Sequence, residues 1–328
     1  MSGPTVYVAL QQFCEMDDRP RRLLLEAGCE VRQNTLGRRL RREDLLDALR
    51  EADAVLAGVE PYDAELLAAL PRLRCISRCG AGIDSIDLEA ARRLGIAVYT
   101  TPDEVVEPVA QMTVGMILAL ARNLPLHVRE AGDGLWKKRT GVLLSEWTIG
   151  VVGFGRIGRR VGELLKPFGP RVLVHDPALS AGDLPDGVEW KDLPSLLAGA
   201  DLVSLHAGRP ATGGPLLGRR ELQLMKPGSL LVNTARGFLV DEAALEEALQ
   251  SGRLAGAALD VFQEEPYTGP LARLPQVLCT PHVASLTRAS RAQMELRAAR
   301  HILEHVARSR SETSRRPTAT MVSHDSAG

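Results

Sequence analysis

Three polar residues in the last third of the chain follow stretches that we predict to be strands. Arg236 lies in LLVNTARGFLVDE, Glu265 in ALDVFQEEP and His282 in CTPHVAS. A guanidinium binds a carboxylate through two parallel hydrogen bonds, and a histidine donates protons near neutral pH. A carboxylate beside the histidine orients the ring and stabilises its protonated form. These residue types could bind a 2-oxoacid and protonate its keto oxygen as a hydride arrives, without a metal ion, although spacing alone does not show that they meet.

A glycine-rich segment, TIGVVGFGRIGRRVGELL, lies between a predicted strand and a predicted helix. Gly153, Gly155 and Gly158 have the G-x-G-x-x-G spacing that permits a tight turn, close approach of a pyrophosphate to the backbone and close packing of helix on strand. Asp176 stands 18 residues beyond Gly158, where a carboxylate would accept hydrogen bonds from a ribose 2′-hydroxyl and repel a 2′-phosphate. The segment therefore favours NAD over NADP. The alternative is a structural glycine turn with an unrelated surface aspartate.

Alternating strands and helices must position these residues. Beyond residue 148 the strand pattern recurs six times with helical patterns between, which is typical of a doubly wound dinucleotide-binding fold. Such sheets bind ligands at the carboxyl ends of their strands, where the three polar segments stand. Strands are expected at 148–153, 171–175, 202–206, 229–234, 255–261 and 277–280, and helices near 157–168, 193–197, 219–225, 241–250 and 289–306.

The first hundred residues alternate in the same way, which predicts a second parallel sheet covered on both faces. Four arginines between residues 38 and 42 resemble a phosphate-binding patch, but acidic residues follow at once, so we interpret this run as the exposed start of a helix. Strands are expected at 5–10, 54–57 and 73–77, and helices near 21–27, 64–70 and 88–94.

A new element is expected where the two alternating regions join. Thr101 to Glu104 has the form of a capping box with Pro102 as the first helical residue. The apolar stretch 105–120 is shorter than a membrane span and is interrupted by polar residues, so we predict a helix buried in the core or packed against a partner in a two-fold dimer. The polar residues 309–328 lack periodicity and are predicted to be disordered.

Composition limits the classes of protein to consider. The 328 residues suggest about two domains, and the formal net charge of −1 offers no reason to expect a nucleic acid or an anionic membrane as partner. Five cysteines without a C-x-x-C pair predict neither a disulfide framework nor a zinc site. The first residues lack a signal-peptide pattern, so we expect a cytoplasmic protein.

Read together, the motifs resemble those of the D-isomer-specific 2-hydroxyacid dehydrogenase family, and more closely its phosphoglycerate-dehydrogenase-like branch. The resemblance runs in family order to about Val306. It implies an α/β fold of two Rossmann-like doubly wound domains, in which an NAD-binding domain, residues 103–284, is inserted into a discontinuous flavodoxin-like substrate domain, residues 1–102 and 285–308. It also implies closure of a cleft and a homodimer. The motifs that carry it are SRCGAGIDSID, VVGFGRIGRRV, DLVSLH, LMKPGSLLVNTARGFLVDE, LDVFQEEP and TPHVAS.

The resemblance also implies the roles of individual residues. The catalytic residues are expected to be Arg236, Glu265 and His282. The substrate-binding residues are expected to be Arg78, Gly80, Ala81, Gly82 and Arg236, with the Gly80–Gly82 backbone amides on the substrate carboxylate. Asp260 is expected to contact the nicotinamide carboxamide. The full cofactor-binding set is expected to be Gly153, Gly155, Arg156, Ile157, Gly158, Asp176, His206, Thr234, Ala235, Arg236, Asp260 and His282, with no metal ligands.

This chain departs from the family pattern at one residue and one loop, and it retains the pattern at a third place. Gln111 stands where members commonly have glutamate, and AGRPATGGP follows the S-L-H motif where they commonly have threonines. These differences affect the expected dimer packing and a loop beside the cofactor. Glu265 is retained, whereas the formate-oxidising branch typically has glutamine, so a 2-hydroxyacid is favoured over formate.

For some other polar residues two roles stay open, and for others no role is assigned. Arg78 precedes the Gly80 loop and would either bind a second anionic group of the substrate or form a salt bridge at a strand end. His206 is expected to be structural or to lie beside the cofactor. Cys75 and Cys79 are expected to pack in or beside a strand. No function is assigned to His127, His175, His301, His305 and His324.

The function predicted from these residues is NAD-dependent interconversion of a (2R)-2-hydroxyacid and its 2-oxoacid. A substrate with one anionic group and a phosphorylated or otherwise dianionic one both stay open. Two alternatives are an NAD-sensing, corepressor-like interaction protein and a dehydrogenase of phosphite or another small oxyanion, because a scaffold does not determine a function. The sequence leaves the individual hydroxyacid and the physiological direction open.

Overall fold

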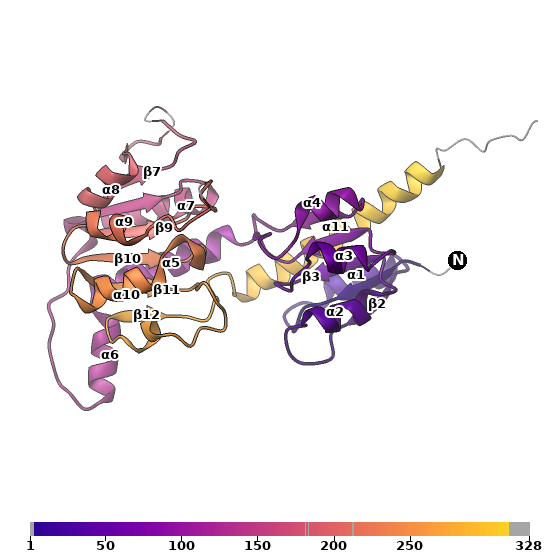
Figure 1. Cartoon of the computed structure of the whole chain (residues 1–328), viewed down its shortest axis with the longest axis horizontal. Helices are drawn as coiled ribbons and strands as arrows, with labels where there is room; N and C mark the ends of the chain where they lie inside the picture. Colours follow the sequence, from indigo (N-terminus) through magenta and orange to yellow (C-terminus); the bar gives the residue numbers. More distant parts are fainter. Residues whose placement is uncertain (1–2, 181, 183, 212, 315–328) are drawn as a thin grey trace, which may run out of the picture. The chain divides into compact units, whose positions relative to one another are not determined.

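The computed structural model describes residues 3–314 except 181, 183 and 212, and within α11 the side chains only as far as Arg308. These residues form two compact units (Figure 1). Unit 1 contains the residues up to Val105 and those from Thr287 onward, and unit 2 contains Val106–Leu286. The chain thus passes from unit 1 to unit 2 and back.

Unit 1 is built on a five-stranded parallel sheet in the order β2-β1-β3-β4-β5. Because successive strands are added on opposite sides of β1, the order reverses between β1 and β3, which is the flavodoxin-like arrangement. All four residues of β3 are apolar and buried, as expected for a parallel strand covered on both faces. The strands are β1 (Thr5–Val8), β2 (Glu30–Gln33), β3 (Ala54–Ala57), β4 (Cys75–Arg78) and β5 (Ala97–Thr100).

Helices cover this sheet, and one of them comes from the far end of the chain. The last helix, α11, packs on α1 and on strands β3, β4 and β5, so the C-terminal segment completes the core of unit 1. The helices are α1 (Arg19–Glu26), α2 (Arg42–Leu49), α3 (Ala64–Ala68), α4 (Leu88–Arg93) and α11 (Arg288–Ser314).

Unit 2 contains a seven-stranded parallel sheet in the order β12-β11-β10-β9-β6-β7-β8, the doubly wound arrangement with its reversal between β6 and β9. One apolar core lies under α5 and α7, and another under α8, α9 and α10 on the opposite face. The strands are β6 (Thr148–Val152), β7 (Arg171–His175), β8 (Val188–Trp190), β9 (Leu202–Leu205), β10 (Ser229–Asn233), β11 (Leu254–Leu259) and β12 (Val277–Cys279). The helices are α5 (Val106–Ala121), α6 (Leu124–Gly132), α7 (Arg156–Leu165), α8 (Leu193–Gly199), α9 (Arg219–Leu224) and α10 (Glu242–Gln250), with 3₁₀ turns η1 (Leu144–Glu146), η2 (Lys166–Phe168), η4 (Gly237–Leu239) and η5 (Pro270–Arg273).

The predicted fold class is confirmed, and the strands and α-helices that were not predicted are β2, β5, β8 and α6. The pattern missed β2, β5 and β8 because none of their residues is fully buried, so these strands carry no buried apolar run. The arginine-rich run does start a helix: Arg38 pairs with Asp44, and Arg42 with Asp63 at the N-cap of α3.

The predicted capping box at Thr101 is wrong. Residues 101–105 are not helical, and α5 begins at Val106. The Thr101 hydroxyl instead accepts a hydrogen bond from the backbone N–H of Gly80 at 2.7 Å, a tertiary contact that overrides the local cap. The predicted disorder of residues 309–314 is also wrong, because α11 continues to Ser314, as extending an existing helix needs no new nucleus. Residues 315–328, including His324, lie outside the described residues.

The apolar helix α5 is buried along most of its length, as predicted. Its exposed side carries Glu107 and Gln111, and Gln111 donates to Glu107, which also pairs with Arg160 of α7. Within the described residues no single helix is long and apolar enough to span a membrane; α5 and α6 meet the test only as a pair, bent by 66°.

Candidate active site

The glycine turn lies between β6 and α7, as predicted. Gly153 has φ of +88°, and a Cβ there would approach the backbone of His206 to 2.6 Å. A Cβ at Gly158 would lie 2.1 Å from the carbonyl oxygen of Gly153, whereas one at Gly155 would meet no atom within 4 Å. Two glycines are therefore required by packing and the third leaves the backbone open at the N-terminus of α7. This geometry fits a dinucleotide pyrophosphate.

Asp176 follows β7 and is bound to this turn. Its Oδ2 accepts the backbone N–H of Phe154 at 2.7 Å, and its Oδ1 accepts that of Ala178 at 2.9 Å. The carboxylate is therefore held beside the glycines while partly exposed, where it retains lone pairs for ribose hydroxyls. Its role in ribose binding stays a prediction. Beside it, Arg156 is exposed and Ile157 packs against the core.

His206 follows β9 and supports the same turn. Its Nε2 lies 2.8 Å from the hydroxyl of Ser204, and burial lowers its pKa to about 4. The ring is therefore neutral near pH 7, and its backbone packs against Gly153. This environment favours a structural or cofactor-side role over acid–base chemistry.

Arg236 follows β10, in a segment held by Asn233, which the sequence analysis did not single out. The buried Asn233 side chain donates to the carbonyl of Arg236 at 2.9 Å and accepts from the N–H of Ala235 at 3.0 Å. A Cβ at Gly237 would lie 1.9 Å from the carbonyl carbon of Phe262, so the segments after β10 and β11 pack in contact. Thr234, expected at the cofactor, is buried and bonds the Thr113 hydroxyl of α5 at 2.8 Å.

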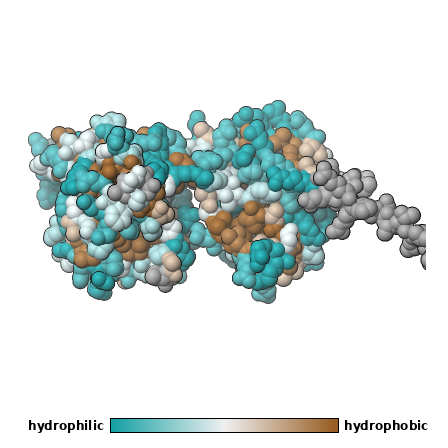
Figure 2. All heavy atoms as spheres, turned by 90° about the horizontal axis from the view of Figure 1, so that it is seen from above, coloured by the Kyte–Doolittle hydropathy of each residue, from teal (hydrophilic) through white to brown (hydrophobic). Residues whose placement is uncertain are grey.

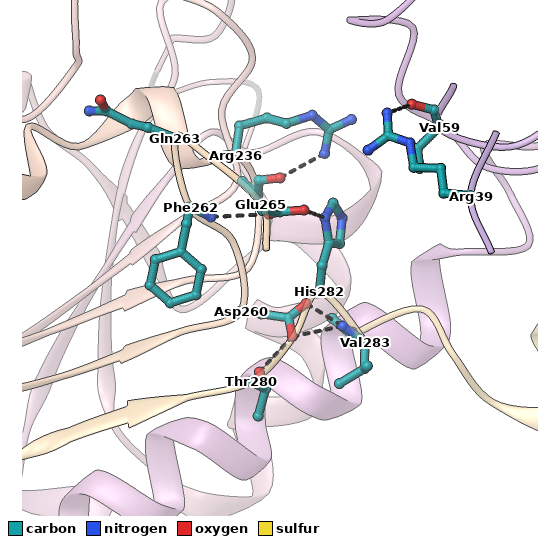
Figure 3. Close-up of polar contacts among 12 residues, drawn as sticks. Arg39, Val59, Arg236, Asp260, Phe262, Gln263, Glu265, Thr280, His282 and Val283 are labelled. Carbon is teal, nitrogen blue, oxygen red and sulfur yellow. Dashed lines mark hydrogen bonds and ion pairs between the residues drawn. The ribbon is translucent and has the colours of Figure 1, made fainter. Parts of the chain in front are cut away.

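His282 and Glu265 are in direct contact. Nδ1 of His282 lies 2.8 Å from Oε2 of Glu265, and both side chains are partly exposed, at 42% and 34%. The other carboxylate oxygen of Glu265 accepts the backbone N–H of Phe262 at 3.1 Å, which fixes the carboxylate. Figure 3 shows Arg236, Glu265 and His282 gathered at the ends of adjacent strands, and Nε2 of His282 makes no hydrogen bond to a residue that the structure describes. The structure thus brings together the three residues that spacing alone could not join.

Asp260, at the end of β11, is fully buried and organises the His282 loop. Its Oδ1 accepts the Thr280 hydroxyl at 2.5 Å and the N–H of Val283 at 2.9 Å, and its Oδ2 accepts the N–H of Ala284 at 2.9 Å (Figure 3). Between these anchors His282 adopts φ of +54°, a left-handed conformation that is unfavourable for a residue with a Cβ. The structure therefore gives Asp260 a positioning role. Its predicted contact with the nicotinamide carboxamide stays a prediction.

In unit 1, the Gly80 turn follows β4. Gly80 has φ of +138°, and it exchanges two hydrogen bonds with Thr101, which is fully buried. The backbone N–H of Gly80 is therefore already bonded to Thr101. The amides of Ala81 and Gly82 have no hydrogen-bond acceptor among the residues that the structure describes, so these two are the ones that can bind a carboxylate.

The cysteines and possible metal ligands take no part in this arrangement. Cys75 and Cys79 are buried in and beside β4, as predicted, and burial raises the pKa of each thiol to about 12. Within the described part of the chain, no three histidine, cysteine, aspartate or glutamate side chains gather where they could hold a metal ion.

Comparison with known proteins points to one family. Residues 114–284 match the model of the D-isomer specific 2-hydroxyacid dehydrogenase, NAD binding domain. A glyoxylate reductase from Aeropyrum pernix is 40% identical over 275 residues, 80% of this chain and 82% of that protein. A D-3-phosphoglycerate dehydrogenase from Mycobacterium tuberculosis is 39% identical over 271 residues, and this chain spans only 50% of its length.

Solved structures extend the similarity to both units. The TT0316 protein from Thermus thermophilus has a TM-score of 0.83 and 37% identity, with 92% of this chain and 97% of that chain covered. The D-lactate dehydrogenase from Aquifex aeolicus, complexed with NAD and lactic acid, has a TM-score of 0.81 and 27% identity, with 94% and 97% covered.

Proposed function

Because this chain belongs to the D-isomer specific 2-hydroxyacid dehydrogenase family, whose members are NAD-dependent oxidoreductases, we propose that it interconverts a (2R)-2-hydroxyacid and its 2-oxoacid. One observation carries the proposal: the 2.8 Å contact between His282 and Glu265 at the end of the same sheet as Arg236. An acid–base histidine with a carboxylate on Nδ1 and an arginine nearby suits a substrate that carries a carboxylate beside a carbonyl.

In the direction of reduction, Arg236 binds the substrate carboxylate and polarises the keto oxygen. The Gly153 turn would hold NAD, which would supply the hydride in its reduced form and accept it in its oxidised form. Nε2 of His282 donates the proton that the keto oxygen gains as the carbonyl carbon receives the hydride, so the product is a neutral hydroxyl. Glu265 stabilises the imidazolium before the transfer and orients its ring through Nδ1. The amides of Ala81 and Gly82 add donors for the carboxylate.

The test is consumption of NADH with a panel of 2-oxoacids, carried out on the wild type and on His282→Asn. Asparagine keeps a polar side chain but cannot donate a proton at neutral pH, so we expect a loss of about 10²- to 10⁴-fold in kcat, the range for general acid catalysis. His127→Asn, in α6, is the matched control and should keep full activity. Undiminished turnover by His282→Asn would refute the assigned acid.

We also propose roles for the two units and an assembly. Unit 2 is the NAD-binding domain and unit 1 the substrate domain. A homodimer formed through unit 2 is the expected assembly, with α5 as the element to examine; light scattering on the eluted protein should give twice the monomer mass of 35.5 kDa. A cytoplasmic location is proposed from cysteine usage, and fractionation of cells tests it.

Neither alternative function is favoured by a specific observation. A corepressor-like NAD sensor would bind NADH without turning over any 2-oxoacid, and a phosphite dehydrogenase would reduce NAD with phosphite. Measurements of NADH binding and of NAD reduction by phosphite, added to the 2-oxoacid assay, therefore separate all three.

A further inference from the structure

The loop after β1 is held by the far end of the chain. Residues 10–17, which we call the β1 loop, make no backbone–backbone hydrogen bond with any residue that the structure describes. Two side chains of α11 bond to the backbone of this loop instead. Glu295 Oε2 accepts the N–H of Cys14 at 2.9 Å. Arg291 Nη2 donates to the carbonyl of Gln12 at 2.5 Å. The shape of the β1 loop therefore depends on side chains that lie 279 and 281 residues away in the sequence.

Glu295 and Arg291 form a largely buried pair. Their side chains are 3% and 23% exposed, and Arg291 Nε donates to Glu295 Oε1 at 2.6 Å. Both carboxylate oxygens of Glu295 therefore accept a hydrogen bond. Burial raises the pKa of Glu295, and the bonds from Cys14 and Arg291 oppose this rise. Cys14 adopts φ of +61°, a left-handed conformation that is unfavourable for a residue with a Cβ and persists only where its surroundings impose it. The pair thus maintains a strained loop.

The β1 loop stands at the edge of the sheet that carries the Gly80 turn. The carboxyl ends of β1, β3 and β4 meet at one edge, and the strand order reverses between β1 and β3, the usual ligand position in such a sheet. Only β3 separates β1 from β4, so these two strands lie about 10 Å apart, twice the spacing of neighbouring strands. Arg78, the last residue of β4, donates to the carbonyl of Cys79 in front of the Gly80 turn, and its role at the substrate stays a prediction. A substrate carboxylate at the Gly80 turn would therefore lie within reach of the β1 loop only through a side chain of several carbons.

A hollow of about 490 Å³ borders the β1 loop and can take such a side chain. It is lined by Glu15, Met16, Asp17 and Arg19 on one side and by the first turns of α11 on the other. Arg288 of α11 adds a second guanidinium, so two positive charges balance the two carboxylates of the lining. Hydrophobic side chains are exposed on the surface of unit 1 (Figure 2), and Met16 in this lining is 52% exposed. The hollow therefore favours neither sign of charge and offers an apolar contact.

From these observations, and given the proposed function, we infer that the β1 loop contacts the uncharged side chain of a 2-oxoacid substrate beyond its third carbon. Arg291 and Glu295 are the positioning residues that hold the loop for this contact, and neither touches the substrate. A loop released from α11 leaves the carboxylate at the Gly80 turn and the hydride and proton transfer in unit 2 unchanged. It loses only the contacts to the distal carbons, so α11 controls the specificity for side-chain length.

A series of unbranched 2-oxoacids of increasing length tests this inference: glyoxylate, pyruvate, 2-oxobutanoate and 2-oxohexanoate, each assayed by consumption of NADH. In the wild type KM should decrease from pyruvate to 2-oxohexanoate, because each further methylene gains apolar contact. A wild type that reduces glyoxylate and pyruvate but neither of the longer acids overturns the inference.

Two variants test the positioning residues. Arg291→Met removes the donor to the Gln12 carbonyl, and Glu295→Gln places an NH₂ group opposite either the N–H of Cys14 or Arg291, which are both donors. For each variant we expect KM for 2-oxohexanoate to rise about tenfold, the effect of one or two methylenes left in water, while KM for glyoxylate and every kcat change by less than about twofold. An equal rise of KM over the whole series would show a general structural effect and overturn the inference.

Hydrogen exchange of the β1 loop tests the support separately from the substrate. Exchange of the amides in residues 10–17 should be faster in both variants than in the wild type, because their only backbone bonds among the described residues go to Arg291 and Glu295. Unchanged exchange in both variants would show that α11 does not hold the loop and would overturn the inference.

Controls separate a failed inference from a failed fold or a failed function. Arg300→Met removes the same charge from an exposed position further along α11 and should leave the KM series and the exchange unchanged. Binding of NADH, measured by its fluorescence, depends on unit 2 and should be unchanged in every variant. If the buried Glu295→Gln does not fold, the more exposed Arg291→Met still decides the question. If the wild type binds NADH but reduces none of the four oxoacids, the proposed function fails, whereas turnover with a uniform response of the variants contradicts only the inference.

Discussion

Replacing Asp260 with asparagine tests whether this residue positions His282 or contacts the cofactor. Asparagine has nearly the same volume as aspartate, but its side chain has only one acceptor oxygen. Its amide nitrogen would then face either the N–H of Ala284 or the donors from Thr280 and Val283, all of which the carboxylate now accepts. The substitution therefore creates at least one buried pair of opposed donors.

The magnitude follows from the number of bonds. One buried donor left without an acceptor costs about 1–3 kcal/mol, and the remaining bonds change from charge-assisted to neutral at about 1 kcal/mol. We expect a loss of about 3 kcal/mol, which lowers the Tm of a unit of this size by about 6–12 °C. His282 would also lose the frame that maintains its φ of +54°, and a misplacement of about 1 Å can reduce kcat about 10²-fold.

The assays are thermal unfolding, NADH binding and NADH consumption with a 2-oxoacid. A positioning role predicts a lower Tm and kcat with a nearly unchanged Kd for NADH. Asp241→Asn is the matched control, because Asp241 caps α10 through the N–H of Ala244 at 3.0 Å and asparagine caps helices equally well. If Asp260→Asn unfolded at the wild-type temperature while its Kd for NADH rose, the positioning argument would be refuted and cofactor contact favoured.

Three further predictions follow from the same geometry. Glu265→Gln should lower kcat about 10- to 100-fold at an unchanged Kd for NADH, since a hydrogen bond to a charged group is worth about 1.5–3 kcal/mol; an unaltered kcat would contradict the role of the 2.8 Å contact. Asp176→Ala should raise the NADPH-to-NADH ratio of kcat/KM at least about tenfold, since the carboxylate that repels a 2′-phosphate is gone, and a constant ratio would exclude that role. The pKa of His206 is lowered to about 4 in the folded protein, so the unfolded chain binds the extra proton, and stability should fall by up to about 3 kcal/mol as the pH decreases from 6.5 to 4. Urea unfolding at pH 7.5 and pH 4.5 should show a smaller decrease for His206→Gln than for the wild type; equal decreases would contradict the assignment.

The elements that the sequence predicted well share one property. Strands β3, β6, β9, β10 and β11 are buried along most of their length and consist mainly of apolar residues, and a single sequence displays such a run directly. Strands β2, β5 and β8 lack it, since solvent reaches one side and polar residues are tolerated. The capping box predicted at Thr101 is absent because the Thr101 hydroxyl bonds to the Gly80 turn, 21 residues away.

For the site, the sequence by itself determined which chemical groups are present and that each stands just after a strand, because these are properties of residue type and local pattern. It also determined the glycine turn, because Gly158 packs on the carbonyl of Gly153 only five residues earlier. Only the tertiary structure decided that Glu265 meets His282 and that Asp260 and Asn233 hold their loops. These contacts join segments from different strands, and the direction of a side chain there depends on sheet order and on partners that are distant in the chain.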